Sequence, residues 1–186
     1  MAKRHLLFAG AIAACTLAFP ASAGVTVLGA GNARMCYLAA ESNDRPDIAV
    51  LQRCSDALIE ERADIVHVVA THVNRGILRL RRGDTSGALA DFDMATRLNP
   101  DEPEAYLNRG SVLLRNEQTV DAISQFDAAI AKNTRRPALA YFGRGVAYEG
   151  AGNLRAAYRD YQRAAQLAPT WEMPRTELTR FRVSRN

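Results

Sequence analysis

Apolar residues along most of the chain recur every three to four positions, the spacing that places them on one face of an α-helix. From Val69 onward this pattern becomes regular, and short segments rich in glycine, asparagine and proline separate the apolar stretches. No alternating β-branched run of strand length follows Leu28. The pattern predicts an all-α protein whose helices form a regular series.

A short motif recurs within these predicted helices. Asn74-Arg75-Gly76 is followed 34 residues later by Asn108-Arg109-Gly110, and Gly143-Arg144-Gly145 follows after 35 more. A period of this length indicates stacked helical hairpins rather than one closed globule. Further positions that keep these steps are His72, Ala88, Phe92, Ala95 and Pro100, then Tyr106, Ala122, Phe126 and Ala129, then Tyr141, Ala157, Tyr161, Ala164 and Pro169.

This series of aromatic, glycine, alanine and proline positions resembles the tetratricopeptide repeat family, whose unit is a pair of antiparallel helices spanning about 34 residues. The resemblance implies a right-handed α-solenoid of stacked hairpins. It places three units at residues 69–102, 103–137 and 138–171.

Three residues depart from the family pattern: His72 replaces an aromatic residue, Glu117 a turn glycine and Thr134 a proline. Glycines recur where the two helices of a unit are expected to pass closest, because a residue without a Cβ permits close packing. We expect alanines to face them and aromatic rings to fill the gap towards the next unit. The glycines are Gly76, Gly110 and Gly145, the alanines Ala88, Ala122 and Ala157, and the aromatics Phe92, Phe126 and Tyr161.

A shorter helical segment precedes the repeats. Residues 32–66 predict a degenerate hairpin with helices from Ala33 to about Glu41 and from Asp47 to about Arg62. Because a terminal repeat has a neighbour on one side only, this hairpin is interpreted as an N-terminal cap.

At the other end, residues 172–186 predict a capping helix that runs from about Pro174 to Arg182. Its Leu178 and Phe181 are expected to cover the apolar face that the third unit would otherwise expose.

Residues 1–23 predict a signal peptide. A basic head is followed by the uncharged apolar run Leu6–Phe19 and by Ala21-Ser22-Ala23, a small-x-small pattern that favours cleavage before Gly24. The apolar run is shorter than the roughly 20 residues of a bilayer-spanning helix, so no transmembrane span is expected. Residues 24–31 then form an extended, loosely held lead-in.

A second kind of processing stays open. Ile12-Ala13-Ala14-Cys15 resembles the lipobox of bacterial lipoproteins, in which the cysteine carries a lipid anchor. The apolar run continues past Cys15, however, and an ordinary cleavage site follows it. These features favour export to the bacterial periplasm, or secretion, over a lipid anchor.

Export would place the two remaining cysteines, Cys36 and Cys54, in an oxidising compartment. Two antiparallel helices joined near Pro46 bring these positions level with each other, which favours a disulfide over two buried thiols. Two cysteines without a nearby histidine do not complete a zinc site.

The charge of the chain does not indicate a particular partner. Without Lys3 and Arg4, 22 basic residues face 20 acidic ones, a net charge of +2. This excess is too small to indicate a nucleic acid or a membrane surface as the partner.

No sequence motif for catalysis or for a bound cofactor occurs in the chain. His67 and His72 are five residues apart, a spacing that does not place them on one helix face as a metal pair. Asp91 and Asp93 are interpreted as part of a solvated helix face. The sequence therefore predicts a protein that is not an enzyme and that needs no cofactor or metal.

The family resemblance implies a groove for a partner along the first helix of each unit. The amides of Asn74 and Asn108 can both donate to and accept from a peptide backbone, and Arg81 and Arg115 can bind a carboxylate. Two alternatives stay open: the asparagines bond within the scaffold, or the C-terminal helix or a second copy of the chain covers the groove. The groove residues carried over by position are Val73, Asn74, Ile77, Arg81, Leu107, Asn108, Ser111, Arg115, Phe142 and Val146.

Arg75, Arg109 and Arg144 form a row directly before the repeated glycines. Such a row can bind an anionic partner, but arginines at this spacing more commonly form a solvated or salt-bridged edge, which is the interpretation we favour.

These features predict a non-enzymatic adaptor, exported in a bacterium, that binds a peptide or helix of an unidentified protein partner. The alternative is a structural or self-associating component of an envelope assembly.

Overall fold

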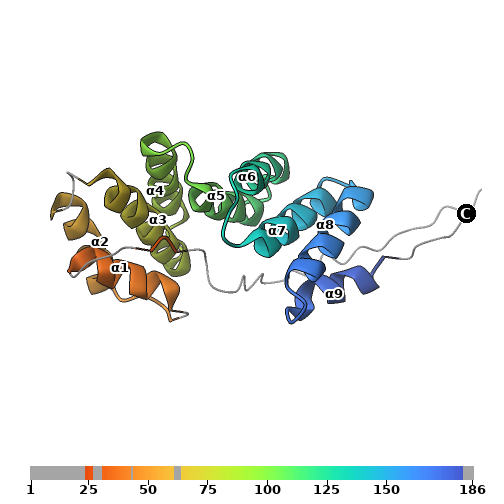
Figure 1. The fold of residues 1–186 in the computed structure, drawn as a ribbon, viewed down its shortest axis with the longest axis horizontal. Helices are drawn as coiled ribbons and strands as arrows, with labels where there is room; N and C mark the ends of the chain where they lie inside the picture. Colours follow the sequence, from red (N-terminus) through yellow and green to blue (C-terminus); the bar gives the residue numbers. More distant parts are fainter. Residues whose placement is uncertain (1–23, 27–30, 43, 61–63, 182–186) are drawn as a thin grey trace, which may run out of the picture.

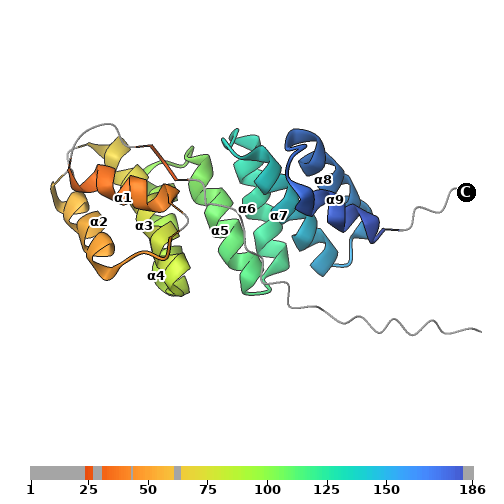
Figure 2. The same ribbon diagram turned by 90° about the horizontal axis from the view of Figure 1, so that it is seen from below.

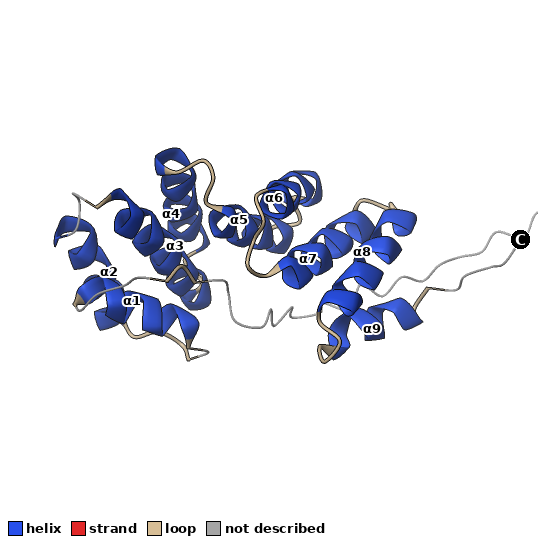
Figure 3. Ribbon diagram, in the orientation of Figure 1, coloured by secondary structure: helices blue, strands red, loops and turns tan. Residues whose placement is uncertain are grey.

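The structure is a computed structural model, and it describes residues 24–26, 31–42, 44–60 and 64–181. Every regular element in these ranges is an α-helix, as Figure 3 shows. The helices pair into antiparallel hairpins that stack into an elongated arch (Figure 1). The all-α solenoid that the repeats predict is confirmed. The predicted signal peptide, with Cys15, lies outside the described residues.

The helices fall into a terminal hairpin, three repeat units and a final helix. Among the residues that the structure describes, no helix is both long and apolar enough to cross a bilayer. Figure 2, which views the stack from below, shows the hairpins following one another along the long axis. The helices are α1 (Asn32–Glu41) and α2 (Ile48–Glu60), α3 (Ile65–Arg82) and α4 (Thr85–Leu98), α5 (Pro103–Arg115) and α6 (Thr119–Ala131), α7 (Pro137–Gly150) and α8 (Leu154–Leu167), and α9 (Glu172–Thr179).

The first helix of each repeat unit begins where its local sequence satisfies the helix N-terminus. The side chain of Asp64 caps α3 by accepting hydrogen bonds from the backbone N–H groups of Val66 and His67. Pro103 and Pro137 open α5 and α7, where the missing proline N–H would have no partner within the helix.

Each repeat unit is held together by an aromatic ring that packs on a backbone glycine. A Cβ built on Gly76 would lie 2.5 Å from the buried ring of Phe92 on α4. The corresponding distance is 3.0 Å between Gly110 and Phe126. The third unit repeats the contact, with 2.9 Å between a Cβ on Gly145 and the Tyr161 ring.

The nearest neighbours of these glycines are therefore rings, whereas the sequence led us to expect Ala88, Ala122 and Ala157. A ring reaches further from its own helix than an alanine methyl group, so it meets the glycine first. The expected role of the rings between units is observed for Phe126, because a Cβ on Gly143 of the next unit would lie 2.5 Å from it.

We predict that Gly76→Ala destabilises the protein. Alanine gains about 1 kcal/mol of helix propensity, but a methyl group this close to Phe92 overpacks the core, which costs about 1–3 kcal/mol. Urea unfolding measures the net loss, and Gly110→Ala, with its longer distance, should lose less. Phe92→Leu in the Gly76→Ala background should recover part of the loss. Strictly additive effects of the two substitutions would contradict the proposed contact.

The turn between the two helices of each unit requires a left-handed backbone. Gly83 and Gly152 occupy this turn with φ of 88° and 78°, and Glu117 occupies the equivalent position in the second unit with φ of 60°. A side chain in this region is strained, because its Cβ approaches the following carbonyl oxygen. The replacement of a turn glycine by Glu117 therefore has a conformational cost.

We predict that Glu117→Gly raises the free energy of unfolding by about 1 kcal/mol, because glycine adopts this conformation without strain. Urea unfolding provides the measurement. Glu117→Ala is the matched control, since it removes the exposed carboxylate but keeps the strained Cβ. An equal gain from both substitutions would show that charge, rather than backbone strain, is responsible.

A disulfide ties the two helices of the N-terminal hairpin together. Cys36 on α1 and Cys54 on α2 are bonded, with their Cα atoms 5.1 Å apart, as the sequence predicts. Both cysteines are fully buried in one core cluster with Val73 and Ile77 of α3. The disulfide therefore stabilises the hairpin at the surface that packs against the first repeat unit.

The C-terminal helix begins earlier than expected, at Glu172 rather than Pro174. A proline in the first turn is tolerated, because the first N–H groups of a helix have no intrahelical acceptor. Leu178 and Phe181 pack against the core of the third unit, as predicted. The helix also ends earlier than expected, at Thr179 rather than Arg182.

Candidate functional site

The predicted groove residues lie on the first helices of the three units, but few of them are open to solvent. Arg115 is exposed, and Arg81 and Val146 are half-buried. The others are at most 7% exposed, because neighbouring helices and the N-terminal residues cover them. These buried residues are Val73, Asn74, Ile77, Leu107, Asn108, Ser111 and Phe142.

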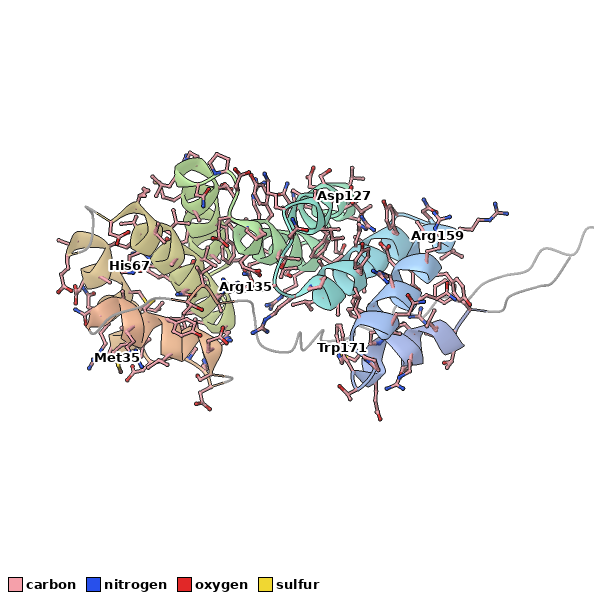
Figure 4. All side chains as sticks on the ribbon, in the orientation of Figure 1. Met35, His67, Asp127, Arg135, Arg159 and Trp171 are labelled. Atoms are coloured by element: carbon pink, nitrogen blue, oxygen red, sulfur yellow. A yellow bond between two sulfur atoms is a disulfide. The ribbon has the colours of Figure 1, made fainter. Side chains whose placement is uncertain are left out.

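Two terminal elements cover the ends of the predicted groove. The α1–α2 hairpin packs on α3, where Val73 and Ile77 join its core cluster. At the other end the ring of Trp171, labelled in Figure 4 just before α9, lies 4.8 Å from the ring of Phe142. A partner that contacts these side chains must therefore displace part of the chain itself. Their role in binding stays a prediction.

Asn74 holds an extended piece of the chain's own backbone. Its Oδ1 accepts a hydrogen bond from the backbone N–H of Val25, and its Nδ2 donates to the backbone carbonyl of Val25, both at 2.8 Å. The asparagine is fully buried, and 49 residues separate the two partners. This is the two-point amide contact that the sequence suggested for a bound peptide, made here to residues 24–26, the N-terminal segment.

Contacts at both ends fix the N-terminal segment on the inner side of the stack, which is the side of the first helices α3, α5 and α7. The backbone nitrogen of Gly24 donates to Glu41 Oε1 at 3.1 Å, and Arg135 Nη1 donates to Thr26 Oγ1 at 3.3 Å. Gly24 is buried, and Val25 packs against the core cluster of the first unit. The expectation of a loosely held lead-in is therefore wrong for these residues, because polar side chains from three separate helices or loops bind them.

A buried glutamate positions Arg135 next to this segment. Glu104 is fully buried on α5 and accepts hydrogen bonds from the Thr134 hydroxyl at 3.0 Å and from the Arg135 backbone N–H at 2.7 Å. Thr134 thus replaces the family proline with a side chain that ties the corner before α7 to α5. Neither the sequence motif nor the helical period indicated this role for Glu104.

Two other predicted groove residues bond within their own helix. Asn108 Nδ2 donates to the carbonyl of Glu104 at 2.8 Å, and Ser111 Oγ donates to the carbonyl of Leu107 at 3.1 Å. The amide of Asn108 therefore contributes to the scaffold, one of the two alternatives that the sequence left open. A contact between Asn108 and a partner stays a prediction.

Arg81 binds the C-terminal end of α1. Its guanidinium donates to the carbonyls of Ala39 at 3.2 Å and Ala40 at 2.7 Å, and to that of Ser42. A cation is favourable here, because the last carbonyls of a helix carry partial negative charge. Burial lowers the pKa of Arg81, while the carboxylate of Glu41 opposes this shift. The guanidinium that was expected to bind a carboxylate thus attaches α1 to α3.

The predicted arginine row forms ion pairs between helices. Arg75 Nε and Nη2 donate to the carboxylate of Asp91 at 3.0 and 2.7 Å, and Arg144 makes the same pair of bonds to Asp160 at 2.7 and 2.9 Å. The hydrogen bonds to Asp160 raise the pKa of Arg144. The interpretation of this row as a salt-bridged edge is confirmed.

The middle unit differs because Gln125 stands where the other two units have an aspartate. Arg109 pairs instead with Asp93 of the preceding unit at 2.8 Å. Arg144 makes the equivalent inter-unit contact with Asp127 at 2.5 Å. Ion pairs therefore link the second helix of one unit to the first helix of the next.

Asp91 was expected to be solvated but is only 2% exposed. Its carboxylate contacts His72 Nδ1 at 2.9 Å, the guanidinium of Arg75, and Arg79 Nη1 at 2.8 Å. Burial by itself raises the pKa of this carboxyl group, but hydrogen bonds from His72 and Arg75 and the charges of both arginines outweigh burial and lower the pKa. Arg75 and Asp91 are 16 residues apart, and Arg144 and Asp160 repeat this spacing. This repeated spacing is the sequence pattern that could have indicated the ion pair.

We predict that Asp91→Asn costs about 3 kcal/mol of unfolding free energy at neutral pH, because it removes the buried counter-charge of the partly buried Arg75 and Arg79. A carboxyl group with a lowered pKa stabilises the fold above its unfolded pKa of about 3.9, and this contribution is lost as the pH falls through the lower folded value. Urea unfolding across pH 2–7 should show that the parent loses this part of its unfolding free energy at low pH and that the variant does not. Asp93→Asn, at a more exposed pair, should change stability much less. Parallel pH profiles for the parent and Asp91→Asn would contradict the assignment.

Next to the N-terminal segment lies a small apolar pocket of about 260 Å³. Burial raises the pKa of Glu102 at its rim, and Ile65 and Val66 expose much of their side chains. The lining residues are Val25, Ile65, Val66, Val69, Leu98, Asn99 and Glu102. Val25 therefore forms part of the wall of this pocket.

No group of three or more metal-ligating side chains occurs among the residues that the structure describes. His67 lies 3.4 Å from Asp64 and His72 contacts Asp91, so each histidine pairs with a carboxylate. The prominent polar side chains of the described stack therefore serve helix packing and the binding of backbone.

Sequence models of the tetratricopeptide repeat match residues 73–133 and 138–171, together just over half of the chain. The chain belongs to the tetratricopeptide repeat family. This family is a non-catalytic fold that mediates interactions between proteins. No curated protein sequence gives a significant match.

Several solved structures of other proteins share this fold. The first tetratricopeptide repeat domain of Spaghetti (RPAP3), bound to the HSP90 peptide SRMEEVD, is 26% identical with a TM-score of 0.57, and the match covers 60% of this chain and 88% of that one. The first such domain of human RPAP3 is 26% identical with a TM-score of 0.58, and the match covers 61% of this chain and 89% of that one. MamA from Desulfovibrio magneticus RS-1 is 26% identical with a TM-score of 0.61, and the match covers 70% of this chain and 71% of that one.

Proposed function

We propose that the protein is a non-enzymatic adaptor of the bacterial envelope that binds an extended segment of a partner protein on the inner face of its stack. The observation that carries this proposal is the pair of hydrogen bonds between Asn74 and the backbone of Val25. In these bonds the fold presents a buried side-chain amide to an extended backbone. The peptide-bound RPAP3 domain supports the proposal by analogy.

The chemistry of this contact specifies the class of ligand. Asn74 bonds to main-chain N–H and C=O groups, which every peptide has, so this contact selects conformation rather than sequence. Val25 also packs against the apolar core cluster of the first unit, which adds selectivity for an apolar side chain at this position. A segment with an extended backbone and one small or medium apolar residue fits both features.

The location in the envelope rests on the sequence. The predicted signal peptide and the pair of cysteines are both typical of an exported protein. The buried disulfide between α1 and α2 is consistent with folding in an oxidising compartment.

We predict that Asn74→Ala weakens partner capture by at least about tenfold, because two hydrogen bonds of roughly 1 kcal/mol each are lost. A chain that starts at Val27, and so lacks the residues that occupy Asn74, is immobilised at its C-terminus and incubated with a periplasmic extract. Captured proteins are quantified by mass spectrometry. Arg159→Ala, on the exposed side of α8 (Figure 4), is the matched control and should capture as the parent does. Equal capture by the parent and a folded Asn74→Ala variant would contradict the proposal.

A further inference from the structure

A prediction from the sequence and an observation in the structure meet at Gly24. The sequence predicts that export cleavage leaves Gly24 as the first residue of the mature chain. In the structure the backbone nitrogen of this buried residue donates to Glu41 Oε1 at 3.1 Å. The nitrogen that cleavage would release as an amine therefore already faces a carboxylate.

We propose that Glu41 and Asn74 form a binding site for the chain's own processed N-terminus, consisting of a glycine ammonium group followed by one extended residue. Cleavage hydrolyses the Ala23–Gly24 peptide bond with one water molecule, and an export peptidase is the catalyst. Ala23 keeps the new carboxylate, and Gly24 keeps the amine, which takes up a proton near neutral pH. A neutral amide with one N–H thus becomes a cation with three.

The change strengthens the contact with Glu41, because a neutral amide donor is replaced by a cation that the carboxylate attracts directly. Glu41 also lies 3.6 Å from Arg136 at the start of α7. Arg81 and Asp44 are the other charged groups that act in this cluster. The ammonium group would therefore join a network that already connects α1 with the third unit.

The site has a steric preference as well. A Cβ built on Gly24 would overlap with the carboxylate of Glu41 and lie 3.3 Å from Asn74 Oδ1. A larger first residue forces Glu41 away from the backbone nitrogen, so the site favours glycine. Val25 then makes both bonds with Asn74, and Thr26 accepts one from Arg135.

This site gives cleavage a structural consequence. Removal of the signal peptide fastens the N-terminal segment across the inner face, where it occupies the amide that the proposed function assigns to a partner. If that function holds, the partner competes with the chain's own first residues. The binding of the N-terminus itself does not depend on any partner.

The test compares two chains, one that starts at Gly24 and one that keeps Ala23 before it, each with Glu41 or with Glu41→Gln. We expect the start at Gly24 to raise Tm by roughly 2–4 °C over the Ala23 start, as for about 1 kcal/mol in a chain of this size. The same change should raise the ¹⁵N heteronuclear NOE of Val25 and Thr26. Both differences should vanish in the Glu41→Gln pair.

Two controls separate the ammonium group from other effects. Acetylation of the Gly24 chain keeps its length but removes the charge, so it should behave like the Ala23 chain. Glu172→Gln, at an exposed carboxylate on α9, should leave the difference between the two starts intact. Light scattering should give a monomer for the Gly24 chain.

Three results would overturn the proposal. The first is an equal Tm and NOE for the two starts with Glu41 present, and the second is an unchanged difference with Glu41→Gln. The third is a dimer whose dissociation frees Val25 and Thr26, which would assign the site to the N-terminus of a second copy. None of these measurements involves a partner, so their failure leaves the proposed adaptor function to its own test.

Discussion

The contact on which the rest of the structure depends is the packing of an aromatic ring against a glycine of the facing helix. It occurs in every repeat unit and sets how closely the two helices approach, since any Cβ at the glycine would crowd the ring. Close approach brings the polar side chains of the two helices within hydrogen-bonding distance. The paired bonds from Arg75 to Asp91 and from Arg144 to Asp160 have the same geometry for this reason.

The repeated packing leaves other positions free to differ from unit to unit. Where Gln125 interrupts the aspartates, the middle arginine pairs with the preceding unit instead. Glu104, near the start of α5, accepts hydrogen bonds from Thr134 and Arg135 in the corner before α7. Asn74, at the position that Asn108 holds in the next unit, binds the backbone of Val25. One scaffold contact thus supports several local functions.

The two ends of the stack are closed by different means. At the N-terminal end, a disulfide joins α1 to α2, and Arg81 binds the last carbonyls of α1 from α3. At the C-terminal end, aromatic rings close the stack, since Trp171 packs on Phe142 and Phe181 lies 5.9 Å from Tyr161. Each closure covers apolar surface that an additional repeat would otherwise bury.

The sequence by itself determined the helical class, the number of repeat units and the cysteine pair, because these depend on periodic spacing and on short-range geometry. It also identified the Asn74 amide as a group suited to a peptide backbone. Only the tertiary structure decided which backbone that is, since 49 residues separate Asn74 from Val25 and no local pattern links them. For the same reason the burial of Asp91 and Glu104 was missed: each lies on a polar-looking stretch of sequence, and its charged or hydroxyl partners come from other helices and turns.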